Sequence, residues 1–310
     1  MDSTERYIEE HKEVFSTKNT RKKKHLSKPK ALIGGSFFRL LKYHIKSIAR
    51  CFLLYPVALY QGRKYLSKTL KLSGTARNRK SLVIGNGPSQ GYLNVKELDQ
   101  FVKSGGETYC VNNWNQNTRL SSHIPSWIVF SDPFQFDKSD KSTDHLINYL
   151  KKNSSIKILI PTQQIKLIET MKLKNEIYCY IELELSVWKN INPLLPRGYI
   201  SMTLYKALAW NISLDYNAIG VIGMDNTLPR YIYNNQNNQV HVLETYAGAD
   251  NCLVDVSSYH SNVASYYYDV FKIFSHLEYF PNKNISNLDL YSLTDRFKKV
   301  DKNDFFNNKV

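Results

Sequence analysis

Short apolar runs alternate with amphipathic stretches from residue 81 to residue 277, and few folds can bury such a chain. A short apolar run fits a strand that is buried on both faces of a sheet, and an amphipathic stretch fits a helix packed against that sheet. Strands that alternate with helices predict an α/β fold with a Rossmann-like, mostly parallel sheet. The predicted strands span 81–85, 108–111, 127–130, 156–160, 177–180 and 218–222, and the predicted helices span 94–105, 142–152, 163–172, 201–212 and 263–277.

Charge divides the chain into parts. The chain has 42 basic and 27 acidic residues, and residues 1–80 contain 20 of the basic and 5 of the acidic ones. The rest of the chain therefore has 22 basic and 22 acidic residues and no net charge. We therefore expect a basic extension over 1–75, a globular body over 76–285 and a C-terminal tail over 286–310. Within the body, the segment at about 226–258 is rich in Asn and Tyr and has little periodicity, which predicts a long loop or lid.

The basic extension predicts an amphipathic helix. Apolar side chains recur every three or four residues, basic side chains recur beside them, and Pro56 is expected to stop or kink the helix. The charge-free run 51–62 has 12 residues, fewer than the ~20 that a bilayer span needs. The apolar set is Phe37, Leu41, Ile45, Ile48 and Phe52, and the basic set is Arg39, Lys42, Lys46 and Arg50.

An anionic membrane surface suits this helix, because each cation near such a surface contributes about 1 kcal/mol. The alternative is that the apolar face docks on the protein body or on a partner subunit, and a homo-oligomer is left open. No nucleic-acid-binding motif accompanies the charge, so no nucleic acid is expected as a partner. Four widely spaced cysteines, Cys51, Cys110, Cys179 and Cys252, form no paired framework and predict reduced thiols in a cytosolic compartment.

Polar residues follow several of the predicted strands at the point where each strand ends. They are the stretches Gly85-Asn-Gly-Pro-Ser89, Asn112-Asn113, Ser131-Asp-Pro133 and Gly223-Met-Asp225. The carboxyl ends of parallel strands meet at one edge of a sheet, and ligands bind in the crevice there. The sequence therefore predicts a small-ligand crevice at this edge, with glycines that let a ligand approach the backbone.

The glycine-rich turn points to a nucleotide with a single phosphate. It begins like the dinucleotide fingerprint G-x-G-x-x-G, but Gln90 occupies the third glycine position. About 20 residues further on, where an acidic residue should bind the ribose, stand Tyr109, Cys110 and Val111. NAD is therefore disfavoured, and no Walker A sequence is present. The two glycines still leave backbone N–H groups available to a phosphate.

The order of these features resembles the bacterial sialyltransferases of the Campylobacter type, glycosyltransferase family 42, over residues 81 to about 277. The shared features are a strand followed by G-N-G-P-S, an asparagine after the second strand and a G-x-D strand end. An R-x-x-x-S element, a lid that contains tyrosines and a late His-Ser pair that enters a helix complete the set. The basic extension lies outside the resemblance.

The resemblance implies a GT-A-like domain that transfers a sialic acid from its CMP-activated form to a hydroxyl of a bacterial surface glycan, in lipopolysaccharide or capsule. It also implies inversion at the anomeric carbon and no metal or other cofactor. Nucleoside-diphosphate donors usually need a cation held by carboxylates. The chain has no pair of aspartates spaced i, i+2, which supports the metal-free expectation. Together with the basic helix, this places the protein peripherally at the cytoplasmic face of the inner membrane.

The resemblance also assigns roles to individual residues. His260 would be the general base, since a neutral imidazole can accept the acceptor's proton at pH 7. Tyr231 and Tyr233 would be lid hydroxyls that hydrogen-bond the departing phosphate. The residues implied to surround the CMP-sugar are Asn86, Gly87, Ser89, Asn112, Asp132, Arg197, Ser201, Gly223 and Asp225, with Arg230 as a further nearby cation.

Differences from the family fall where the donor sugar is expected to bind. The family usually has an asparagine at the position of Asp132, and Arg197 is displaced by one position. Another CMP-activated ulosonic acid, such as Kdo or a pseudaminic-type sugar, is therefore an alternative donor. G-N-G-P-S also begins proteins related to pterin pyrophosphokinases, which would bind ATP with Mg²⁺. A non-enzymatic membrane-bound scaffold for polysaccharide assembly is the remaining alternative.

Overall fold

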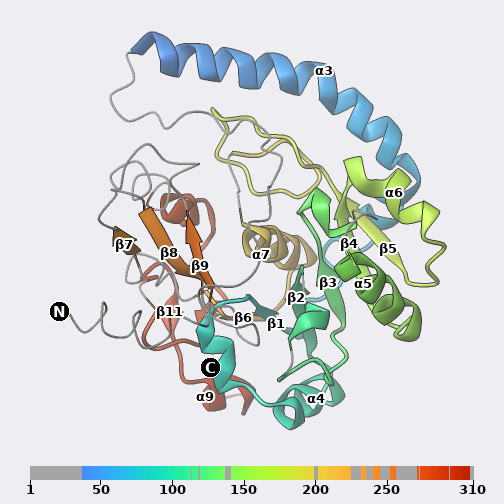
Figure 1. Ribbon diagram of the computed structural model, residues 1–310, viewed down its shortest axis with the longest axis vertical. Coiled ribbons are helices and arrows are strands. Elements are labelled where there is room, and N and C mark those ends of the chain that lie inside the picture. The colour runs from blue at the N-terminus through green and yellow to red at the C-terminus, as the bar shows by residue number, and fades with distance from the viewer. Residues whose placement is uncertain are drawn as a thin grey trace.

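The protein is built around one large parallel sheet (Figure 1). The computed structural model describes residues 37–112, 114–117, 119–136, 141–198, 202–224, 232–234, 240–244, 252–255, 271, 273–292 and 294–307. Eight strands lie in the order β11-β10-β6-β1-β2-β3-β4-β5, and every pairing between them is parallel. The strands are β1 (Lys80–Ile84), β2 (Glu107–Val111), β3 (Trp127–Val129), β4 (Lys157–Pro161), β5 (Ile177–Tyr180), β6 (Ala218–Ile222), β10 (Ile285–Asn287) and β11 (Lys298–Lys299).

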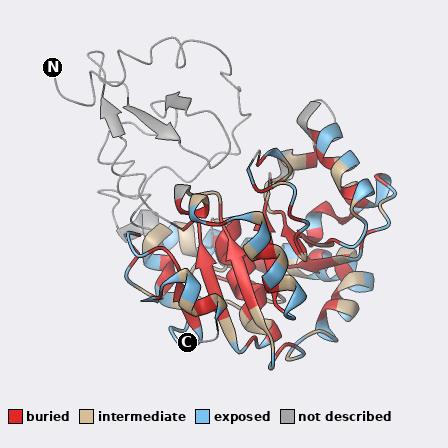
Figure 2. Cartoon of the chain, turned by 90° about the horizontal axis from the view of Figure 1, so that it is seen from below, coloured by how far each residue is buried: buried red, intermediate tan, exposed pale blue. Residues whose placement is uncertain are grey.

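This architecture confirms the predicted α/β class and the parallel sheet. The strands are apolar throughout because both faces are covered, and successive side chains enter different cores. Leu82 and Ile84 of β1 belong to one buried cluster, whereas Val83 belongs to the other. The first cluster includes side chains of four helices, α3 (Phe37–Leu70), α4 (Val95–Lys103), α5 (Lys141–Lys152) and α6 (Ile165–Thr170), and the second includes side chains of α7 (Thr203–Leu214). Figure 2 shows the buried strands between helices whose outer surfaces are exposed.

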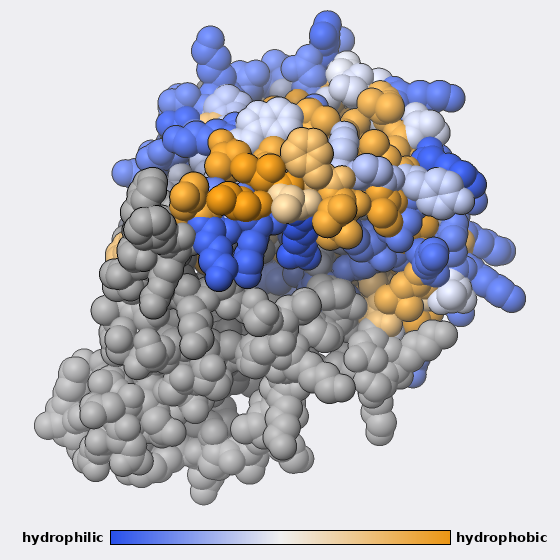
Figure 3. All heavy atoms as spheres, turned by 90° about the horizontal axis from the view of Figure 1, so that it is seen from above, coloured by the Kyte–Doolittle hydropathy of each residue, from blue (hydrophilic) through white to orange (hydrophobic). Residues whose placement is uncertain are grey.

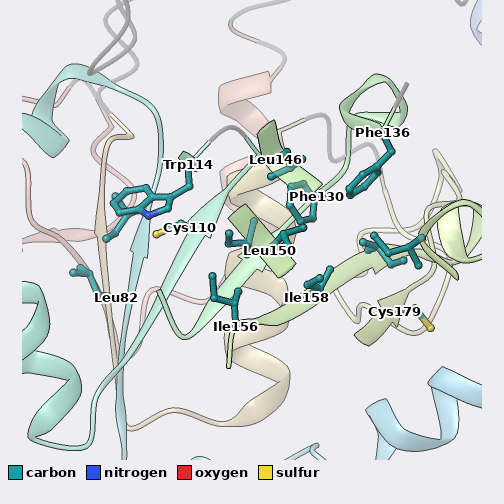
Figure 4. Close-up of a cluster of buried hydrophobic side chains, with 14 of the residues drawn as sticks. Leu82, Cys110, Trp114, Phe130, Phe136, Leu146, Leu150, Ile156, Ile158 and Cys179 are labelled. Carbon is teal, nitrogen blue, oxygen red and sulfur yellow. The ribbon is translucent and has the colours of Figure 1, made fainter. Parts of the chain in front are cut away.

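The helices follow the sequence pattern closely. α4 (Val95–Lys103) opens with the predicted capping box, in which Asn94 Oδ1 accepts a hydrogen bond of 2.9 Å from Glu97 N and Glu97 Oε2 accepts one from Asn94 N. Such reciprocal bonds satisfy N–H groups that the first helical turn leaves free. The other helices beside the sheet are α5 (Lys141–Lys152), α6 (Ile165–Thr170) and α7 (Thr203–Leu214). Figure 4 shows part of the first cluster, where side chains of α5 meet Phe130 and Ile158 over the sheet.

The basic extension forms α3 (Phe37–Leu70), a helix of 34 residues that continues through Pro56. Pro56 was predicted to stop or kink the helix, and the stop is wrong; Figure 1 shows that the ribbon of α3 curves along its length. The helix packs beside β5, and Cys51, Ala58 and Leu66 join the first core cluster. Cys51, Cys110 and Cys179 are buried free thiols, as predicted. Within the described residues, no helix combines the length and the apolar character that a bilayer span requires.

Two further segments differ from the prediction. The predicted loop at 226–258 contains three strands, β7 (Ile232–Asn234), β8 (Val240–Glu244) and β9 (Cys252–Asp255), which pair antiparallel in a second sheet. The predicted tail contributes most of β10, all of β11 and the helix α9 (Lys302–Phe306) to the sheet and its core. These strands are two to five residues long, which is too short for a period of two or a buried run to stand out in the sequence.

Candidate functional site

The sheet reverses its strand order between β1 and β6. The chain proceeds from β1 outward to β5 and then returns to place β6 on the other side of β1. In parallel sheets of this kind the crevice outside the carboxyl ends of the strands opens at such a switch point. Two predicted site residues, Gly87 and Gly223, lie here, in the loops that leave β1 and β6. The predicted crevice edge therefore coincides with the topological switch point.

Two glycines bring these loops into close contact. Gly85 N donates a hydrogen bond of 2.8 Å to Ile222 O, and Gly87 N donates one of 3.0 Å to Gly223 O. A Cβ on Gly85 would lie 2.5 Å from Gly223 O, and Gly223 adopts φ +76°, which favours glycine. Both positions require glycine, because a side chain at either would push the two loops apart.

Ser89 stabilises the same turn from within. It is buried, and its hydroxyl accepts a hydrogen bond of 2.8 Å from Gly223 N. Gln90 is also buried, and its Oε1 accepts a hydrogen bond of 2.7 Å from Asn117 Nδ2. Asn86 is half-buried between the two glycines of the turn. Ser89 thus positions the loops, and the predicted contact of Asn86 and Ser89 with a nucleotide stays a prediction.

A second polar group joins β2, β3 and α7 at this edge. Asn112 adopts φ 46°, and its Nδ2 donates a hydrogen bond of 2.9 Å to Thr203 Oγ1. The hydroxyl of Ser131 also bonds Thr203 Oγ1, and Ser131 N donates to Asn112 Oδ1. Thr203 is the first residue of α7, and no side chain caps that helix start. The sequence predicted Asn112 as a site residue but not Thr203. The position of Thr203 near the start of a predicted helix was the feature that could have indicated it.

Two buried cations share one carboxylate beside this polar group. Arg197 is only 3% exposed, and its Nη2 donates to Ile181 O at 2.9 Å and approaches Glu182 Oε2 at 3.5 Å. Lys206 is 5% exposed, and its Nζ lies 2.8 Å from Glu182 Oε1. The guanidinium of Arg197 also stacks over the ring of Tyr180, 5.2 Å from its centroid. We call Arg197, Lys206 and Glu182 the strand-end charge cluster.

The strand-end charge cluster is electrostatically unusual. Burial lowers the pKa of the Lys206 ammonium, although the charge and hydrogen bond of Glu182 oppose that shift. Asp132, which follows β3, is close enough for its charge to raise the pKa of Lys206 slightly. The Nη1 atom of Arg197 is buried and has no hydrogen-bond partner among the described residues. The cluster therefore has positive charge and unused N–H donors in a dry environment.

The sequence predicted Arg197 and Asp132 but not Lys206 or Glu182. Lys206 is a lone charge inside the apolar stretch Leu204–Trp210, in a helix that is buried almost throughout. A single lysine in so apolar a helix was the available signal, since a buried lysine needs a partner. Glu182 carried no comparable signal, because it lies in an irregular segment after β5.

The side chains of the predicted catalytic residues are not described by the structure. His260, Tyr231, Ser201, Asp225 and Arg230 lie outside the described residues. Tyr233 lies on β7 opposite His241, and only its backbone is described. Among the described side chains, no group of three or more His, Cys, Asp or Glu could hold a metal ion.

Other polar features lie elsewhere. His123 is buried, and its ring nitrogens contact Asp99 Oδ1 at 2.7 Å and Thr108 Oγ1 at 3.0 Å, near the start of β2. A surface hollow of about 430 Å³ is lined by Arg79, Lys80 and residues of α4 and α9. It opens at the amino ends of the strands, opposite to the switch point. Neither feature is therefore part of the candidate site.

The fold and the site together define a Rossmann-like α/β protein with polar and cationic residues along the carboxyl edge of its parallel sheet. No protein-family model matches the sequence, and no curated protein is significantly similar to it.

Proposed function

We propose that the protein is a glycosyltransferase of the GT-A-like, sialyltransferase type. It would transfer a sialic acid or a related ulosonic acid from a CMP-activated donor to a hydroxyl of a bacterial surface glycan, with inversion and without a metal. The observation that carries this proposal is the strand-end charge cluster, where Arg197 and Lys206 are buried at the edge expected to bind the donor. A CMP-linked ulosonic acid has both a phosphate and a carboxylate, which such cations would bind.

The unused donors of the cluster argue for an anionic ligand. A buried N–H group without an acceptor costs roughly 1–3 kcal/mol, and Arg197 Nη1 has no acceptor within the part of the chain that the structure describes. Glu182 pairs with both cations, so this group of three carries a net positive charge that the nearby Asp132 opposes in part. α7 adds to it, because no side chain caps its first turn and helix N-termini favour negative charge. An oxygen of a bound phosphate or carboxylate would satisfy these donors.

The turn after β1 supports a mononucleotide rather than a dinucleotide. In dinucleotide-binding proteins the glycine-rich turn leads straight into a helix whose N-terminus binds the pyrophosphate. Here the turn leads into a 3₁₀ segment, Pro88–Tyr92, and α4 begins only at Val95. Gln90 fills the third glycine position with a buried, hydrogen-bonded side chain. The N–H groups of Gly85 and Gly87 already bond Ile222 O and Gly223 O. One phosphate would therefore be bound by another N–H group of the turn, such as that of Asn86.

The proposed chemistry follows the roles given to residues outside the described part of the chain. His260 would take the proton of the acceptor hydroxyl as its oxygen attacks the anomeric carbon of the donor. The bond from that carbon to the phosphate oxygen of CMP would break, and the electron pair would leave with CMP. Tyr231 and Tyr233 would stabilise the developing charge on the phosphate by hydrogen bonding.

Ligand binding tests the nucleotide. Thermal stability would be measured with CMP, CDP, UDP, ATP and NAD, each without metal, and ATP also with Mg²⁺. CMP and CDP should stabilise the fold. Stabilisation by ATP with Mg²⁺ alone would instead favour a pyrophosphokinase-like enzyme, and the absence of any nucleotide effect would favour the scaffold.

The strand-end charge cluster is tested by Lys206→Met, which retains the volume of the side chain. A hydrogen bond to a charged group contributes about 1.5–3 kcal/mol, so affinity for a CMP-linked acidic sugar should fall roughly 10- to 100-fold. Affinity for CMP itself should fall less, provided that Lys206 contacts the sugar acid. Lys80→Met is the matched control, because Lys80 is half-buried at the opposite end of β1 and donates to Phe305 O. Equal effects of both substitutions would refute the role of the cluster.

A further inference from the structure

One face of α3 is fixed to the body by small and polar side chains. Ser47 Oγ donates to Glu184 O at 2.9 Å and accepts from Ser186 N at 2.9 Å. Near the other end, Thr69 Oγ1 donates to Cys179 O at 3.3 Å. Gly62 lets the helix approach closely, since a Cβ there would lie 2.7 Å from Thr162 Cγ2. The face that docks is therefore not the large apolar face predicted from the sequence.

The large apolar side chains of α3 point to the outside instead. Phe52 is 78% exposed and Leu53 is 73% exposed. Figure 3 shows a continuous apolar band along α3, bordered by hydrophilic side chains. Soluble proteins seldom expose a contiguous apolar patch of this kind unless it binds something. We call this band the outward strip, and it consists of Leu41, Ile45, Phe52, Leu53, Val57 and Tyr60.

Charge identifies the occupant of the outward strip. α3 contains no acidic residue, and Lys42, Lys46 and Arg50 are exposed beside the strip. Within the part of the chain that the structure describes, no carboxylate pairs with these three cations. Lys64 and Lys68, further along the helix, do pair with carboxylates of the body. Unneutralised cations thus coincide with the exposed apolar side chains, which is the arrangement that suits an anionic lipid surface.

The contacts of α3 also define its direction. Residues near its C-terminal end, such as Lys68, contact Glu176 at the amino end of β5. Residues near its N-terminal end, His44 and Ser47, contact Ser186 and Glu184 beyond the carboxyl end of β5. The helix therefore runs antiparallel to β5, and most of the outward strip lies toward the carboxyl edge of the sheet. That edge carries the candidate site.

We propose that the outward strip seats the protein on an anionic bilayer surface, with α3 parallel to the membrane plane and the carboxyl edge of the sheet on the membrane side. Apolar side chains would enter the boundary between headgroups and acyl chains, and the three cations would contact the anionic headgroups. If the proposed function also holds, this orientation favours an acceptor whose lipid part lies in the same bilayer.

Vesicle binding by the full chain tests this surface without any substrate, so its outcome is independent of the proposed function. Phosphatidylcholine vesicles with about 30% phosphatidylglycerol would be compared with pure phosphatidylcholine vesicles by co-sedimentation. We expect binding to the anionic vesicles that weakens at high salt. Each cation contributes roughly fivefold to partitioning, so Lys42→Gln/Lys46→Gln should weaken binding at least tenfold.

Phe52→Ser/Leu53→Ser should also weaken binding at least tenfold, since it removes the two most exposed apolar groups of the strip. The matched control is Leu290→Ser/Tyr291→Ser, which changes two exposed apolar residues just after β10, at the end of the strand order away from β5 and α3. The two altered pairs are exposed, so thermal stability should not change. Equal vesicle binding by the strip variant and the control would overturn the proposal. If the wild-type protein does not bind vesicles but forms a dimer that the strip variant abolishes, the outward strip binds a second copy of the chain. That result would also overturn the proposal.

Discussion

Glu107 offers the sharpest test of how this fold is stabilised. Its carboxylate, at the amino end of β2, is buried and receives donors from several elements. Oε1 accepts from Arg79 at 2.9 Å and from Lys157 at 3.2 Å. Oε2 accepts from Trp127 Nε1 at 3.1 Å and from the hydroxyl of Tyr216, and Tyr109 also lies within hydrogen-bond distance at 3.3 Å.

Glu107→Ala should lower the free energy of unfolding by about 4 kcal/mol. Arg79 and Lys157 are partly exposed and can return to water, so their loss contributes little. Tyr109 and Tyr216 can bond each other, since their hydroxyls lie 2.7 Å apart. That leaves the indole N–H and one hydroxyl buried without an acceptor, at roughly 1–3 kcal/mol each.

Urea unfolding monitored by circular dichroism measures this loss as a shift of the midpoint at constant slope. Glu169→Ala is the control, because Glu169 forms only exposed contacts, with Lys64 and Tyr65. It should cost less than about 1 kcal/mol. A Glu107→Ala protein within 1 kcal/mol of wild type would refute the claim that the buried donors depend on this carboxylate.

The same carboxylate predicts a pH dependence. Burial alone would raise the pKa of Glu107, but the hydrogen bond from Tyr216, the charge of Lys157 and the remaining donors outweigh it and lower the pKa. The unfolded chain then binds the proton more readily than the folded chain. The stability that Glu107 contributes is therefore complete above its usual pKa and is lost as the pH falls through the lowered value. Glu107→Ala should reduce this loss of stability at acid pH, as measured by urea unfolding over a series of pH values.

Three further predictions concern other parts of the fold. Gly223→Ala should destabilise the protein by about 3 kcal/mol or more in thermal or urea unfolding, because it combines a positive φ with a backbone clash. Gly74→Ala, with a similar φ and open space, should cost only about 1–2 kcal/mol, and equal losses would contradict the close-approach argument. Burial lowers the pKa of His123 below 6.5, although the charge and hydrogen bond of Asp99 oppose this shift. The wild-type protein should therefore lose stability as the pH falls through 6.5, where the unfolded chain binds the proton more readily. His123→Gln should lose less stability, as measured by melting temperatures from pH 7 to pH 5. Ala58→Glu, on the docked face of α3, should increase hydrogen exchange in β5, whereas Val57→Glu on the outward strip should not.

Much of the fold was visible in the sequence because it depends on neighbouring residues. The apolar runs at β1, β2, β4 and β6 predicted those strands within a residue or two of their observed ends. Asn94 and Glu97 predicted the start of α4, since a capping box acts within one turn. The polar residues after the strands predicted the edge at which Gly87, Asn112 and Gly223 lie.

The docked face of α3 was not predictable in the same way. The sequence shows a large apolar face, and burial of that face would be the usual expectation. The body instead covers Ser47, Ala58 and Gly62, and Gly62 lies so close to Thr162 that a larger side chain there would clash. Shape complementarity between distant segments decided which face was covered.

By itself, the sequence determined the elements, their α/β order and the polar ends of the strands, because period, caps and turns depend on residues close together along the chain. Only the tertiary structure decided that β10 and β11 extend the sheet, that Lys206 shares Glu182 with Arg197, and that the apolar side of α3 faces outward. Each of these outcomes joins residues far apart in sequence, and packing in three dimensions sets which of them meet.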